Sequence, residues 1–64
     1  MKVKELVDRL ALDGWMLVRL RGSHRQYRHP VKKGTVTVSG KSSADIPIGT
    51  LKSALKQAGL LRKD

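Results

Sequence analysis

The chain of 64 residues has no cysteine, and it has no long apolar run. Without cysteine there can be no disulfide, no thiolate nucleophile and no metal–thiolate site. No apolar stretch approaches the roughly 20 residues of a membrane span, and no apolar signal segment follows the N-terminus. We therefore expect an intracellular, reducing compartment, the cytoplasm, and a single small domain over residues 1–64 with a thin core.

Acidic residues are also scarce, with 5 Asp and Glu against 14 Lys and Arg, so the formal net charge is +9. No acidic residue lies between Asp13 and Asp45. The basic residues of that interval are Arg19, Arg21, Arg25, Arg28, Lys32, Lys33 and Lys41. A basic run is often only a solvated surface, but this segregation favours a polyanion as partner, or an acidic protein that mimics one.

Two amphipathic segments predict helices. Apolar residues at i, i+3, i+4 and i+7 spacing predict a helix over residues 2–13, which Gly14 ends in a left-handed cap. Pro47 fits the first turn of a second helix, which Gly59 ends. The residues predicted to face the core are Val3, Leu6, Val7, Leu10, Ala11, Leu51, Ala54, Leu55 and Ala58.

Three strands are predicted between the helices, over residues 15–21, 23–29 and 35–39. Gly22-Ser23 fits a two-residue type II′ hairpin turn, which would pair Arg21 with His24 and Val18 with Tyr27. One sheet face then contains Met16, Val18, Leu20, Tyr27, Val36 and Val38, and the other contains Arg19, Arg21, His24, Gln26, Arg28, Thr35 and Thr37. Arg25 falls on the apolar side, so its side chain must extend to an edge.

The predicted order is α-β-β-β-α, which gives an α+β fold with a three-stranded antiparallel sheet. Both helices must bury an apolar stripe, and the simplest solution packs both on the apolar sheet face. Trp15 and Tyr27 are then expected in the core, and His29, opposite Met16 near a strand end, is expected to be structural or exposed at the edge. The basic face is left open.

An open basic face with a histidine in it could act on RNA, which carries its own nucleophile in the 2′-hydroxyl. Cleavage needs a base for that proton and cationic donors for the charge that develops on the phosphate. His24, opposite Arg21, fits this description, whereas two histidines five residues apart without a nearby carboxylate do not suit a metal. Two alternatives stay open from the residues alone: a non-catalytic RNA-binding module, and a subunit whose basic face docks an acidic protein.

Four motifs along the chain form a familiar combination. They are DGW-x-LVR (residues 13–19), GSH-x-x-Y-x-HP (22–30), G-x-VTV (34–38) and P-x-GTL-x-S-x-LKQAGL (47–60). Together they resemble the HicA family of toxins, and the resemblance extends from Leu6 to Leu61. It implies a fold similar to double-stranded-RNA-binding domains and the activity of an mRNA interferase that arrests growth.

The resemblance also implies roles for individual residues. His24 corresponds to the family's catalytic histidine and Gly22 to its turn glycine, and a HicB antitoxin typically covers the active surface. Members often carry a further histidine after the third strand, where this chain has Lys41 and serines.

The function expected from the sequence is that of a metal-independent endoribonuclease toxin, which uses His24 as the single general acid/base. The expected RNA-binding residues are Arg19, Arg21, Gly22, Ser23, Arg25, Arg28 and Lys41. The expected partners are mRNA and a HicB-like antitoxin. We expect no cofactor, and a monomer when the chain is free of its partners.

Overall fold

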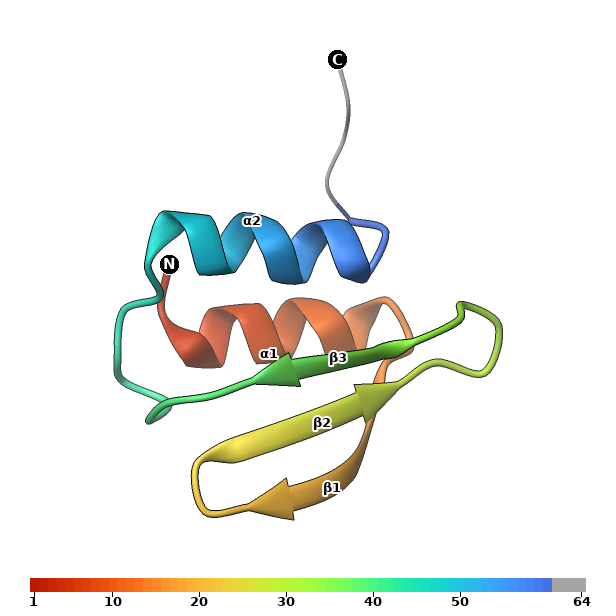
Figure 1. Ribbon diagram of the computed structural model, residues 1–64, viewed down its shortest axis with the longest axis horizontal. Helices are drawn as coiled ribbons and strands as arrows, with labels where there is room; N and C mark the ends of the chain where they lie inside the picture. The colour runs from red at the N-terminus through yellow and green to blue at the C-terminus, as the bar shows by residue number, and fades with distance from the viewer. Residues whose placement is uncertain (61–64) are drawn as a thin grey trace.

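The computed structural model describes residues 1–60, so Leu61, the last residue of the resemblance, lies outside it. The elements are α1 (Val3–Leu12), β1 (Met16–Arg21), β2 (His24–Arg28), β3 (Thr35–Val38) and α2 (Ile48–Gln57). The strands form an antiparallel sheet in the order β1-β2-β3, and both helices lie on one side of it (Figure 1). The predicted α+β fold and its element order are therefore confirmed. Neither helix is long and apolar enough to cross a membrane, within residues 1–60.

The helix boundaries follow from local chemistry. At the start of α1, the backbone N–H of Lys2 donates to the Glu5 carboxylate at 2.9 Å, which satisfies an otherwise unpaired donor. The helix ends before Gly14, whose φ of +102° is unfavourable for any residue with a side chain. Pro47 precedes the first turn of α2 in an extended conformation.

The core is a single cluster between the helices and the inner face of β2 and β3. Its buried members are Val3, Leu6, Leu10, Trp15, Tyr27, Val36, Val38, Ala54 and Ala58. Trp15 and Tyr27 are thus in the core, as predicted. Ala11 was also predicted to face the core and is exposed, because the apolar contacts of α1 end at Leu10.

The pairing of β1 with β2 is regular near the turn and irregular further away. Arg21 pairs with His24 as predicted, but a β-bulge at Val18 shifts the register by one residue. Leu17 therefore pairs with Tyr27, and the predicted Val18–Tyr27 pair is wrong. A bulge inserts one extra residue into one strand, so every residue before it changes face.

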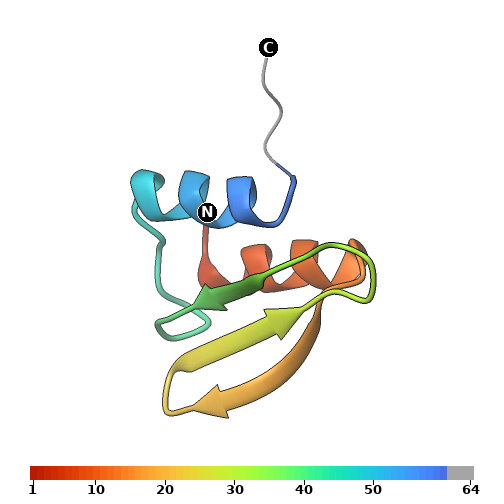
Figure 2. The same cartoon turned by 45° about the vertical axis from the view of Figure 1, so that its right-hand side comes forward.

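The shift changes the faces of two residues. Met16 pairs with Arg28 and lies on the outer face, whereas Leu17 joins Tyr27 on the inner face. His29 consequently does not face Met16, contrary to the predicted register. Even on the inner side, the helices cover β1 poorly. It is an edge strand, and both views show it as the strand farthest from the helices (Figures 1 and 2). Leu17 and Leu20 are accordingly 50% and 61% exposed.

Candidate nucleic-acid interface

Four side chains of β1 and β2 line an open hollow of about 250 Å³ on the outer face of the sheet: Arg19, Arg21, His24 and Gln26. They form two cross-strand pairs in the regular part of the hairpin, Arg21 with His24 and Arg19 with Gln26. Because successive side chains of a strand point to opposite faces, all four lie on the side away from buried Tyr27. The structure therefore brings three of the predicted site residues together and adds Gln26. The sequence already indicated Gln26, because the predicted register pairs it with Arg19 on the basic face.

The turn at Gly22 and Ser23 creates this pairing. Gly22 has φ +58°, and no residue other than glycine has positive φ in residues 1–60, so Ser23 does not either. This combination is the one that a type II′ turn requires. A side chain at Gly22 would meet no atom within 4 Å, so the need for glycine comes from its backbone conformation and not from crowding.

The cations of the hollow are available for a ligand. In the part of the chain that the structure describes, the ion pairs are Lys2–Asp45 and Lys32–Asp13, and neither involves Arg19 or Arg21. Arg19, Arg21 and His24 are exposed. Guanidinium groups without a carboxylate partner present several N–H donors in a planar fork, which suits phosphate oxygens.

The remaining predicted RNA contacts lie around the hollow at different places. Arg28 is on the same outer face, two residues beyond Gln26 and about 7 Å further along β2. Gly22 and Ser23 are exposed in the hairpin turn itself. Lys41 is exposed in the turn after β3, at the end of the sheet where the β1–β2 turn also lies (Figure 1).

Arg25 is not brought together with the others. It pairs with Val38, which is buried, and so points to the inner side of the sheet. Its Nη1 donates to the backbone oxygen of Gly40 at 2.9 Å, and its Nη2 donates to Ser42 Oγ at 3.4 Å. The side chain extends to an edge as predicted, and there it ties β2 to the segment that follows β3.

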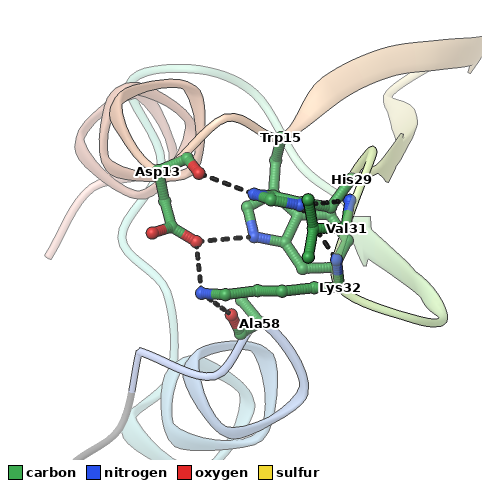
Figure 3. A network of polar contacts seen from close by, with 6 residues as sticks. All are labelled: Asp13, Trp15, His29, Val31, Lys32 and Ala58. Atoms are coloured by element: carbon green, nitrogen blue, oxygen red, sulfur yellow. Dashed lines mark hydrogen bonds and ion pairs between the residues drawn. The ribbon is translucent and has the colours of Figure 1, made fainter.

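His29 lies at the opposite end of β2 and has both ring nitrogens occupied (Figure 3). The backbone N–H groups of Val31 and Lys32 donate to its Nδ1, each at 3.0 Å. Because Nδ1 accepts, the ring proton is on Nε2, which donates to the backbone oxygen of Asp13 at 2.7 Å. The ring also meets Trp15 edge to face at 5.3 Å. The expectation that His29 is structural is confirmed.

The Asp13 carboxylate is the second centre of this network (Figure 3). Its Oδ2 accepts from Trp15 Nε1 at 3.1 Å and from Lys32 Nζ at 2.5 Å. Lys32 Nζ also donates to the backbone oxygen of Ala58, at the end of α2. The Lys32 ammonium holds the pKa of the Asp13 carboxyl below its ordinary value. Lys32, one of the seven basic residues of the acid-free interval, is therefore used within the fold.

Within residues 1–60, no three His, Asp or Glu side chains gather closely enough to hold an ion.

The model of a family described as HicA toxin of bacterial toxin-antitoxin matches residues 3–60. No curated protein matches the chain.

Proposed function

The chain belongs to the HicA family of bacterial toxin–antitoxin toxins, and from this premise we propose that it is an endoribonuclease that cleaves mRNA at the hollow of β1 and β2. One observation carries the proposal: His24 lies in that hollow across from Arg21, and Arg19 lines the same hollow. An imidazole and guanidinium groups in one hollow supply a proton carrier and charge stabilisation in one place.

The proposed reaction uses the nucleophile of the RNA. The neutral His24 imidazole takes the proton of a ribose 2′-hydroxyl, and the 2′-oxygen bonds to the adjacent phosphorus. The bond from phosphorus to the 5′-oxygen of the next nucleotide breaks, and this oxygen takes the proton from the imidazolium. Arg21 and Arg19 donate to the non-bridging oxygens as their charge grows. The products are a 2′,3′-cyclic phosphate and a 5′-hydroxyl, so the step needs neither a metal nor a cofactor.

The rest of the strand is proposed to follow the outer face of the sheet. Arg28 extends the cationic row in one direction, and the turn of Gly22 and Ser23, with Lys41 nearby, continues it in the other. We leave Arg25 out of this surface because its guanidinium is bonded on the inner side. The partner proposed to block the same surface is a HicB-like antitoxin, for which the net charge of +9 favours an acidic binding surface.

The proposal is tested with purified protein, a short oligoribonucleotide and a metal chelator. We expect cleavage that yields a cyclic phosphate end, and no cleavage where the attacked nucleotide is 2′-deoxy. The His24→Ala variant should cut at least about 100-fold more slowly. Lys52→Ala, which removes an exposed cation from α2, should cut at the wild-type rate. Cleavage by His24→Ala at the wild-type rate would overturn the role of the imidazole.

A second candidate function uses the same face without chemistry. His24 is the one histidine of the hollow, so no second imidazole is present there to divide the work of acid and base. A non-catalytic module would bind RNA through phosphate contacts and shape, with an affinity that falls steeply with salt. It would leave the oligonucleotide intact in every variant. A surface that docks only an acidic protein would instead show no salt-sensitive RNA affinity.

A further inference from the structure

Gln26 differs in kind from the other three residues of the hollow. Arg19, Arg21 and His24 carry or can carry positive charge, whereas the Gln26 side chain is a neutral amide with both donors and an acceptor. It is partly exposed, and it makes no hydrogen bond with any other group of residues 1–60. Cationic groups suit phosphate, which is the same in every nucleotide. An amide suits the edge of a base, and base edges differ from one nucleotide to the next.

The outer face offers no phenyl, phenol or indole ring on which a base could stack, and the one imidazole of the hollow, that of His24, is given to proton transfer in the proposed function. The chain has one tryptophan, one tyrosine and no phenylalanine. Trp15 and Tyr27 are 2% and 4% exposed, and both belong to the core. Single-stranded RNA is usually held by stacking on aromatic side chains together with hydrogen bonds to base edges. Stacking tolerates every base, so a group of the hollow that forms hydrogen bonds with a base edge is the means of telling one base from another.

We propose that Gln26 reads the base of the nucleotide whose phosphate lies between Arg21 and His24, and that this base is adenine. The inference rests on the proposed function and adds a sequence preference to it. Gln26 lies on the same face of β2 as His24 and about 7 Å away, which matches the reach from a phosphate to the base of its own nucleotide. Glutamine pairs with adenine through two hydrogen bonds, accepting from N6 and donating to N7.

The test is to sequence the ends that the wild type and two variants produce from RNA of random sequence. Wild-type cuts should show about fivefold enrichment of adenine beside the cut, the low end for a bidentate contact because the hollow is open to water. Gln26→Leu should lose that enrichment among the cuts that it makes. Gln26→Glu keeps an acceptor and loses the donors, so adenine should fall and cytosine, which offers an amino donor, should rise.

The matched control is Thr37→Val, at the residue of β3 that pairs with Gln26 outside the hollow. It should leave the adenine enrichment unchanged. Wild-type cleavage without adenine enrichment, or enrichment that survives in both Gln26 variants, overturns the inference and leaves the nuclease intact. A wild type that cuts no RNA overturns the proposed function itself, and the base preference with it.

Discussion

The two histidines lie at opposite ends of β2 and have opposite surroundings. His24 stands exposed in a hollow lined by two arginines, and its imidazole ring makes no hydrogen bond within the described residues. His29 packs against Trp15, and both of its ring nitrogens are bonded to backbone groups. Nothing in the residue type separates them. A histidine whose nitrogens are already used is part of the fold, and one whose nitrogens are free can take up a proton for a substrate.

The same difference separates the cations at the two ends of the sheet. Arg19 and Arg21 have no carboxylate partner within residues 1–60, whereas Lys32 binds Asp13 and the last turn of α2. Arg25 is likewise bonded to the segment after β3. Charge that is already paired within the fold contributes little to binding RNA. The high net charge therefore overstates the size of the proposed RNA surface. The following substitutions compare the paired residues with the unpaired ones.

The largest effect on stability is expected from His29→Ala. It leaves the Asp13 backbone oxygen and the N–H groups of Val31 and Lys32 without their partner, beside a new cavity at Trp15. We expect a loss of about 2–3 kcal/mol in the free energy of unfolding, measured by urea denaturation. His24→Ala should change it by less than about 0.5 kcal/mol, as an exposed side chain does. Equal losses in the two variants would remove the contrast between the histidines.

The second effect concerns the two turn glycines. Gly14 has φ +102°, and a side chain there would approach His29 Nε2 to 3.0 Å, whereas Gly22 has φ +58° and free space around it. Gly14→Ala should therefore cost about 2–3 kcal/mol, from backbone strain and displacement of the imidazole. Gly22→Ala should cost about 1 kcal/mol, from strain alone. Thermal unfolding of the two variants measures the difference. A larger drop in midpoint temperature for Gly22→Ala than for Gly14→Ala would contradict the structure.

The third effect is on the salt dependence of RNA binding, and it should distinguish Arg21 from Arg25. Arg21→Ala should weaken RNA binding about fivefold and reduce the slope of log affinity against log salt by about 0.7, the share of one single-strand phosphate contact. Arg25→Ala should keep the wild-type slope, and it should lose about 1 kcal/mol of stability through its bond to Gly40. Fluorescence anisotropy over a range of salt concentrations measures the first, and urea denaturation the second. Equal slopes for both variants would show that Arg21 makes no phosphate contact.

The smallest effect is a pH dependence. The pKa of Asp13 is lowered in the folded chain, chiefly by the hydrogen bond from Lys32. Its stabilising contribution is therefore complete above the unfolded value of about 3.9, and it is lost as the pH falls through the lower folded value. Unfolding measured from pH 6 down to pH 2 should show a steeper loss in the wild type than in Asp13→Asn. Parallel curves for the two proteins would show that the carboxylate contributes nothing.

The hairpin could be predicted from the sequence as far as the bulge. Near the turn, Gly22-Ser23 alone sets the register, and the pairing of Arg21 with His24 follows. Further along β1 the pattern is ambiguous, because Met16, Leu17 and Val18 are all apolar and either parity places an apolar residue inward. The bulge at Val18 selects Leu17 for the inner face. No local signal in β1 decides this, so the predicted faces failed there.

The sequence by itself determined the order of the elements, the position of the hairpin turn and the concentration of positive charge between Asp13 and Asp45. These features depend on local patterns, such as helical periodicity and a glycine at a turn, which involve residues close together in the chain. The tertiary structure decided which cations stay free and which histidine is bound. Those outcomes depend on contacts that join Asp13, the segment of His29 and Lys32, and Ala58. These three places are far apart in the sequence and meet only when the ends of both helices pack beside the sheet.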